Sequence, residues 1–381
     1  MHDNIYVDNK LKLEAVCRKL QHLEWLAVDT EFIREKTYFP RLALVQVASA
    51  EQVYCVDPLA IPDLSPLLDL MDCRTITKVF HAAGQDLETL YHQRGSVPSP
   101  VFDTQIAAAF LGFGEQLGYA QIVKKMLDVD LDKSSSRTDW MKRPLSSAQL
   151  KYAADDVKYL SRVYPIMVNR LSSLGRLSWM SNEVGALEET SRYVVDPSVC
   201  WTRVKGVGKL NRKQLNILSH LAMWREQRAM EVDRPRRWIV GDDAMVGLAI
   251  VQPATMSELQ DVRLLSQKIK DRYGERLLSL IRTALDSPRS SWPEPKINHR
   301  PTVDEEATMD LLMAAVRVRA ESIRLSPGQI TSRGELLRLI RSETDLPVLS
   351  GWRRGIAGEA LEDVLSGRAV LTCRDGKVVI Q

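Results

Sequence analysis

The sequence predicts an α/β domain followed by two small all-helical domains and a β-hairpin at the C-terminus. Strand-like and helix-like hydrophobic patterns alternate over residues 1–160, which is typical of a domain built around one sheet. Strand patterns almost vanish after Val195, and a Pro- and Ser-rich stretch at 286–306 separates two helical units. A chain of 381 residues is long enough for two or three domains. We therefore expect domains at 1–195, 205–290 and 300–381.

The α/β domain is expected to begin with a short strand in NIYVD and a helix in KLEAVCRKLQHL. Apolar and β-favouring runs predict strands at 25–32, 42–48 and 52–56, and a further strand in TITKVFHA. Helical spacing predicts helices in LSPLLDLM and at 85–93 and 104–111. A long helix is predicted from Ser146, a favourable N-cap residue, to about Leu171.

The second half of the chain is expected to be mostly helical. In the first helical unit, the hydrophobic periodicity predicts helices at 211–231, 242–251, 256–261, 264–270 and 273–286. A second helical unit follows at 306–366. In the tail, AVLTCRDGKVVIQ, two β-favouring runs flank Asp375-Gly376, which is a strong hairpin signal.

The composition is that of a globular protein, with 45% hydrophobic and 27% charged residues. The N-terminus lacks a basic segment followed by an apolar run, and no apolar stretch approaches the about 18 residues of a membrane span. We expect a cytoplasmic protein without a membrane partner. The five cysteines are scattered and never spaced C-x-x-C, so they predict mostly buried thiols, with no disulfide framework or zinc site.

The charge is unevenly distributed along the chain. Residues 1–195 carry a net charge of −3, residues 201–300 carry +8, and residues 301–381 carry −1. A basic unit of this kind indicates an anionic partner, most commonly nucleic acid. The alternative is a solvated basic surface, and the charge alone does not separate the two.

Two carboxylates lie within the apolar strand WLAVDTEF. Alternate residues of a strand point to the same face, so Asp29 and Glu31 should lie side by side. Their mutual repulsion is costly when they are partly out of water. A divalent cation between them would convert the repulsion into coordination, because Mg²⁺ and Mn²⁺ prefer oxygen ligands. The alternative is an edge strand with a solvated acidic face.

Three more polar residues occupy positions suited to a site. Asp86 follows a strand in VFHAAGQDLETL, at the strand end where α/β domains usually build sites, although it could only favour the helix N-terminus. Tyr152 and Asp156 are four residues apart, so they share one helix face. Asp155 is rotated by about 100° and should point elsewhere. A solvated helix with a partly buried tyrosine is the alternative.

Together, Asp29-x-Glu31, Asp86 and Tyr152-x-x-x-Asp156 resemble the tyrosine branch of the DEDD exonuclease superfamily. The segments DTEFIREKTYFPRLALVQVA, FDTQIAAAFLG and LDKSSSRTDWMKRPLS are similar to the bacterial ribonuclease D family, whose pattern fits nearly all of 25–165. The stretch from RPRRWIVGDDAMVG to YGERLLSLI is similar to the helicase-and-RNase-D C-terminal (HRDC) domain. The family carries two such domains; the second is less evident here, and the terminal hairpin departs from its all-helical pattern.

The resemblance implies a ribonuclease-H-like fold and a monomer that shortens RNA from its 3′ end, releasing nucleoside 5′-monophosphates. tRNA precursors would be trimmed in their 3′ trailers. Two divalent ions, Mg²⁺ or Mn²⁺, would be the cofactors. Their ligands would be Asp29, Glu31, Asp86 and Asp156, with Asp29 between the ions. Tyr152 would orient the attacking water, because a phenol with a pKa near 10 is a poor base at neutral pH.

Other residues are candidates for contacts with the substrate. Lys133 and Arg137 are phosphate contacts or part of a surface loop, and Tyr38 and Gln46 are candidates for holding the terminal nucleotide. Arg234, Arg236 and Arg237 would suit phosphates. Their neighbour Trp238 is expected in the helical core rather than as a platform for a base. His81 and Asp103 are expected to be structural.

The same residues are compatible with two other functions. DNA proofreading and helicase-associated exonucleases share the same carboxylates, and only contacts to the 2′-hydroxyl would distinguish the sugars. A non-catalytic RNA-binding scaffold is the second alternative, although the acidic and tyrosine positions are all occupied.

Overall fold

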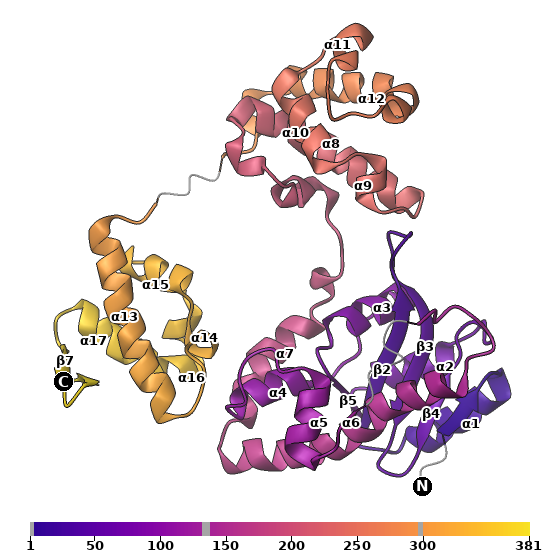
Figure 1. Ribbon diagram of the computed structural model, residues 1–381, viewed down its shortest axis with the longest axis vertical. Helices are drawn as coiled ribbons and strands as arrows, with labels where there is room; N and C mark the ends of the chain where they lie inside the picture. Colours follow the sequence, from indigo (N-terminus) through magenta and orange to yellow (C-terminus); the bar gives the residue numbers. More distant parts are fainter. Residues whose placement is uncertain (1–3, 132–137, 296–299) are drawn as a thin grey trace.

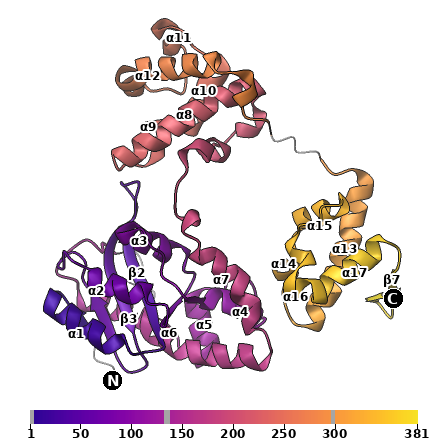
Figure 2. The ribbon, with the colours of Figure 1, turned by 180° about the vertical axis from the view of Figure 1, so that it is seen from behind.

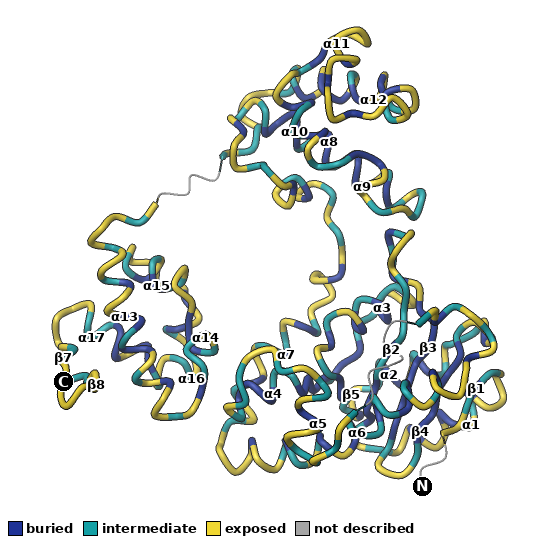
Figure 3. Tube along the Cα trace, in the orientation of Figure 1, coloured by how far each residue is buried: buried dark blue, intermediate teal, exposed yellow. Residues whose placement is uncertain are grey.

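The computed structural model describes residues 4–131, 138–295 and 300–381 (Figure 1). Buried residues, dark blue in Figure 3, lie in an N-terminal α/β domain, a first helical domain and a second helical domain. Their hydrophobic side chains form one core cluster in each domain. The predicted fold class is confirmed, including the terminal hairpin. Among the described residues, no helix combines the length and the hydrophobicity that a membrane crossing requires.

The N-terminal domain contains a six-stranded mixed sheet in the order β1-β4-β3-β2-β5-β6. β2 pairs with β3 in antiparallel fashion and with β5 in parallel fashion, so it lies inside the sheet. This position excludes the alternative of an acidic edge strand. The strands are β1 (Asn4–Val7), β2 (Trp25–Ile33), β3 (Arg41–Ala48), β4 (Val53–Val56), β5 (Thr77–Phe80) and β6 (Val101–Asp103).

Helix α6 (Ser147–Ser173) packs against β1 to β5 and thereby crosses the strand that carries Asp29. It begins as predicted, because the Ser146 hydroxyl accepts a hydrogen bond from the Gln149 amide in a capping box. The other helices of the domain are α1 (Lys10–Leu20), α2 (Ser65–Asp72), α3 (Gly84–Arg94), α4 (Thr104–Phe110), α5 (Tyr119–Leu127) and α7 (Ser181–Glu188). Of these, α5 was not predicted by the hydrophobic pattern.

The first helical domain is organised around a buried ion pair. The Arg225 side chain is 2% exposed and donates to Asp242 Oδ1 at 2.6 Å and to the Val240 carbonyl at 3.0 Å. The two helices predicted at 264–270 and 273–286 form one continuous helix, α12. The helices are α8 (Arg212–Glu231), α9 (Arg236–Ile239), α10 (Asp242–Val251), α11 (Met256–Gln260) and α12 (Gln267–Asp286).

The second helical domain ends in the hairpin of β7 (Leu371–Arg374) and β8 (Lys377–Ile380). Its helices are α13 (Val303–Ser322), α14 (Pro327–Ile330), α15 (Arg333–Ile340), α16 (Gly351–Arg353), the π-helical turn η7 (Arg354–Gly358) and α17 (Glu359–Leu365). Short 3₁₀ helices complete the chain: η1 (Leu177–Met180), η2 (Thr190–Arg192), η3 (Pro197–Arg203), η4 (Val207–Lys209), η5 (Arg289–Ser291) and η6 (Pro347–Leu349).

The second helical domain contacts the N-terminal domain through a stacked pair of indoles. The Trp179 and Trp352 ring centroids are 4.6 Å apart with an interplanar angle of 4°. Beside them, Arg353 forms an ion pair with Glu183, and Arg176 donates to the Ile323 carbonyl at 2.7 Å. These contacts fix the second helical domain on the side of α4 and α7.

The loop between β2 and β3, residues 34–40, points towards the first helical domain (Figures 1 and 2), and its Tyr38 and Phe39 pack with the hydrophobic core of that domain. Tyr38 is 7% exposed and belongs to the core of that domain, where its hydroxyl donates to Glu226 Oε1 at 2.5 Å. Asp233 Oδ1 accepts from the backbone amides of Tyr38 and Phe39 at 2.9 and 3.1 Å. The strand that carries the two predicted acidic ligands therefore continues directly into a docking loop.

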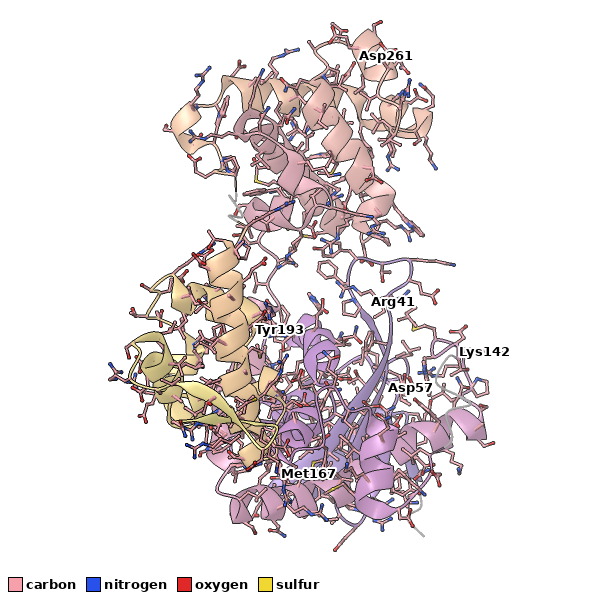
Figure 4. The ribbon with its side chains drawn as sticks, turned by 60° about the vertical axis from the view of Figure 1, so that its left-hand side comes forward. Arg41, Asp57, Lys142, Met167, Tyr193 and Asp261 are labelled. Carbon is pink, nitrogen blue, oxygen red and sulfur yellow. The ribbon has the colours of Figure 1, made fainter. Side chains whose placement is uncertain are left out.

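We predict that Asp233→Ala weakens this docking. The substitution leaves the two loop amides without their acceptor, and a buried unsatisfied donor costs about 1–3 kcal/mol. Hydrogen exchange of residues 34–40 should accelerate, and the radius of gyration from small-angle X-ray scattering should rise. Asp261→Ala is the matched control, because Asp261 is exposed at the far end of the same domain (Figure 4). Unchanged exchange in the loop would show that Asp233 does not hold it.

Candidate active site

Three carboxylates converge where α6 crosses β2. One oxygen each from Asp29, Glu31 and Asp156 lies within 4.8 Å of the others. Alternation along β2 places Asp29 and Glu31 on one face, and α6 supplies Asp156 from across that face. Partly buried oxygen ligands in this arrangement fit a hard divalent cation.

A fourth carboxylate, Asp86, lies in the first turn of α3 and is 7% exposed. Its Oδ1 accepts from the Thr30 hydroxyl at 2.6 Å and from the Thr30 amide at 3.2 Å. Thr30 lies between Asp29 and Glu31 in the sequence. Residues 29–31 therefore supply two of the carboxylates and hydrogen-bond the third, that of Asp86. Asp86 lines the same cavity as Asp29 and Asp156.

Burial is the main cause of raised pKa values in all four acids. The pKa of Asp29 lies well above its usual range, because burial is reinforced by the charges of Asp86, Asp156 and Glu31. Burial, followed by the charges of Asp156 and Asp86, raises the pKa of Glu31 to about 8. Burial raises the pKa of Asp86 and that of Asp156 to about 7. A bound cation would offset the part of these shifts that comes from repulsion between the acids.

Tyr152 lies one helical turn before Asp156, and both side chains line the same cavity. Burial, followed by the charges of Asp156, Glu31 and Asp29, raises the pKa of this phenol above its ordinary value. The hydroxyl therefore stays protonated at neutral pH and can orient a water molecule. Asp155 points away and approaches the Lys151 ammonium at 3.5 Å, in agreement with the helical phase predicted from the sequence.

The cavity has a volume of about 500 Å³, and its lining includes aromatic residues as well as acids. Tyr119, from α5, donates to the Asp155 carbonyl at 3.1 Å and also to the Asp156 carbonyl. His81 Nδ1 is 3.0 Å from the Thr104 hydroxyl, so this histidine is hydrogen-bonded as expected although it lines the cavity. The sequence patterns did not indicate Tyr119, because they did not predict α5.

The turn before α3 depends on Asp103. Ala82 adopts a left-handed backbone conformation, with φ of 57°. The Asp103 carboxylate accepts from the amides of Ala82 and Ala83 at 3.1 and 2.8 Å, and it also caps α4 through Gln105. Asp103 is thus the buried structural acid that the sequence predicts, and it positions the start of the helix that carries Asp86.

Two of the residues predicted to contact the substrate, Tyr38 and Gln46, are buried. Tyr38 is enclosed in the interface with the first helical domain and its hydroxyl is bonded to Glu226. Gln46 is fully buried on β3 opposite Asp29, and its amide atoms have no hydrogen-bond partner among the described residues. The contacts of Tyr38 and Gln46 with the terminal nucleotide stay predictions. Lys133 and Arg137 lie outside the described residues.

The arginines at the start of α9 face solvent. Arg234, Arg236 and Arg237 are exposed, and Arg234 donates to the Lys36 carbonyl at 3.1 Å. The expectation that Trp238 lies in the helical core is wrong, because its side chain is 58% exposed while Ile239 is 4% exposed. In this one-turn helix only one of the two adjacent residues can face the core. Of the cysteines, Cys17, Cys55 and Cys200 are buried, Cys73 is partly buried and Cys373 is exposed.

Comparison with known proteins identifies the relatives of this chain. Residues 4–172 match the family model of a 3′-5′ exonuclease, and residues 214–281 match that of the HRDC domain. A ribonuclease D from Bartonella henselae is 37% identical, covering 96% of this chain and 91% of the relative. A ribonuclease D from Zymomonas mobilis is also 37% identical, covering 98% and 97%.

Solved structures of other proteins share the fold of this chain. The crystal structure of Escherichia coli RNase D, described as an exoribonuclease involved in structured RNA processing, has a TM-score of 0.86 and 31% identity. The match covers 96% of this chain and 99% of that one. A protein from Bifidobacterium adolescentis, with a TM-score of 0.72 and 23% identity, shares the fold over 96% of this chain and 97% of its own.

Asp29→Asn should abolish turnover and leave the metal-free protein folded and slightly more stable. Removing one charge from the cluster relieves repulsion, but it also removes the carboxylate that interacts electrostatically with the other three acids. The melting temperature should therefore be equal or higher in EDTA, and the rise caused by Mg²⁺ or Mn²⁺ should disappear. Asp243→Asn, at an exposed carboxylate, is the control. Near-normal activity in Asp29→Asn would remove Asp29 from the site.

Tyr152→Phe keeps the ring and loses only the hydroxyl. We expect kcat to fall by about 100-fold or more, because misplacing a reactant such as the attacking water can cost about that much, while KM changes little. Tyr159→Phe, on the same helix, and Asp155→Asn should both be nearly silent. Steady-state kinetics on an RNA oligonucleotide with a free 3′ end measures the effect of all three substitutions. An essential Asp155 together with a dispensable Asp156 would refute the assignment of the active face of α6.

Proposed function

The chain belongs to the ribonuclease D family of 3′-5′ exoribonucleases, and we propose that it trims tRNA precursors and other structured RNA with two divalent cations. The observation that carries the proposal is the convergence of four carboxylates and Tyr152 on one cavity. A non-catalytic scaffold does not require a cluster of acids whose pKa values are raised by burial and by their mutual repulsion.

Asp29, Glu31 and Asp156 would hold one cation, because their oxygens are mutually within 4.8 Å. Asp86 stands outside that group but interacts electrostatically with Asp29, which supports a second ion held by these two residues. Bound divalent ions stabilise the attacking and leaving oxygens of an in-line displacement at phosphorus. Mg²⁺ and Mn²⁺ both suit a site made of carboxylates.

The side chains around the ions would position the reactants. The protonated phenol of Tyr152 would hydrogen-bond the attacking water and orient it towards the phosphate. Phe32, Tyr119 and Leu131 line the same cavity and offer apolar surface to the sugar and base of the terminal nucleotide. Arg234, Arg236 and Arg237 would contact phosphates further along the RNA.

Direction and sugar preference can be tested with one set of labelled oligonucleotides. A 5′-labelled RNA should yield a ladder that shortens from the 3′ end with release of nucleoside 5′-monophosphates, and a 3′-phosphate block should slow it. Single-stranded DNA of the same sequence should be a poorer substrate, because it lacks the 2′-hydroxyl. Faster digestion of the DNA would instead support the alternative of a DNA exonuclease.

The proposed physiological substrate requires a separate test. A tRNA precursor with a 3′ trailer should be shortened to the edge of the folded acceptor stem, while an Asp29→Asn preparation leaves it intact. An unstructured RNA of equal length should be degraded without that stop. Failure to shorten the trailer under conditions that degrade the unstructured RNA would exclude tRNA precursors.

A further inference from the structure

We propose that the cavity between the N-terminal domain and the first helical domain binds the single-stranded RNA just upstream of the 3′-terminal nucleotide. The inference deepens the proposed exoribonuclease function and rests on it. The cavity has a volume of about 1280 Å³, compared with about 500 Å³ for the catalytic cavity. Its walls come from the 34–40 loop, the start of α3, residues 192–195 and α9.

The two cavities meet at the turn before α3. Ala82 and Gln85 line both of them, and Gly84, between these residues, lines the upstream cavity with open space beside its Cα. A strand whose last phosphate reaches Asp29 would therefore pass over this turn as it leaves the catalytic cavity. Because Asp103 fixes the amides of Ala82 and Ala83, the passage has a defined wall.

The charge of the upstream cavity suits a phosphate backbone. Arg192, Arg203 and Arg237 line it and are exposed, and within the described residues no carboxylate lies at ion-pair distance from them. Two of the three carboxylates of this cavity have partners: Glu88 pairs with Arg34 at 2.8 Å, and Glu226 is buried and accepts from Tyr38. The third, Glu35, is exposed and has no ion pair among the described residues. Three unpaired arginines therefore face one unpaired carboxylate, and the net positive charge attracts a polyanion.

Trp238 supplies the group that a base would recognise. It lines the upstream cavity with 58% of its side chain exposed, beside Arg236 and Arg237. An indole next to guanidinium groups is the usual composition of a surface that binds single-stranded nucleic acid, because any base can stack on it while phosphates meet the arginines. A duplex offers no unstacked base to this indole, so the cavity favours single-stranded RNA.

The test compares a decaribonucleotide with a diribonucleotide, both unstructured and 5′-labelled, with the full chain and its variants. The dinucleotide reaches only the catalytic cavity, whereas the decamer also fills the upstream one. For Trp238→Ala and for the double variant Arg192→Ala/Arg203→Ala, kcat/KM on the decamer should fall about 10-fold more than on the dinucleotide. The salt dependence of decamer binding should become shallower in the arginine variant, because fewer counterions are released. Arg317→Ala, at an exposed arginine of the second helical domain, controls for charge.

Equal losses on both substrates, or no loss on the decamer, would overturn the proposal. Binding of the decamer, measured by fluorescence anisotropy in an Asp29→Asn background, separates this outcome from failure of the proposed function. If no variant hydrolyses RNA but Trp238→Ala still weakens decamer binding about 10-fold, the upstream cavity binds RNA and only the catalytic proposal fails. If hydrolysis is normal and decamer binding is unaffected, only the upstream cavity is refuted. Unchanged melting temperatures would show that the variants are folded.

Discussion

Repulsion among four carboxylates is the constraint on which the rest of the active site depends. The fold brings Asp29, Glu31, Asp86 and Asp156 to one cavity, and burial there raises the pKa of each acid. The four acids lie on three elements: Asp29 and Glu31 on β2, Asp86 on α3 and Asp156 on α6, so the cluster cannot relax without disrupting one of them. A bound divalent cation would offset the cost of this crowding.

The same strand links the chemistry to the helical domain. β2 carries two of the acids and then continues into the 34–40 loop, whose Tyr38 lies in the core of the first helical domain. The position of α9 relative to the acids is therefore set by a few residues of backbone. This explains how a domain almost two hundred residues further along the sequence can contribute Trp238 to a cavity that borders the active site.

The basic excess of the first helical domain has two parts with different roles. Arg225 is 2% exposed and paired with Asp242, and Lys270 is 7% exposed and donates to the Gln260 carbonyl, so these charges stabilise the domain. Exposed arginines such as Arg203 and Arg237 remain available to a ligand. Net charge alone therefore overstates the surface that attracts RNA.

Local patterns were sufficient for the features that depend on sequence spacing. Alternation placed Asp29 and Glu31 together, the helical period separated Asp155 from Asp156, and Asp375-Gly376 marked the hairpin. Spacing could not reveal contacts between distant segments. Examples are the hydrogen bonds from Thr30 to Asp86, from Tyr119 to the Asp156 carbonyl and from Tyr38 to Glu226. The exposure of Trp238 likewise followed from the packing of a single helical turn. Spacing along the chain predicts which residues share a face, because a face follows from the repeat of one helix or strand. Which faces meet depends on how the whole chain packs, so that information comes from the folded structure.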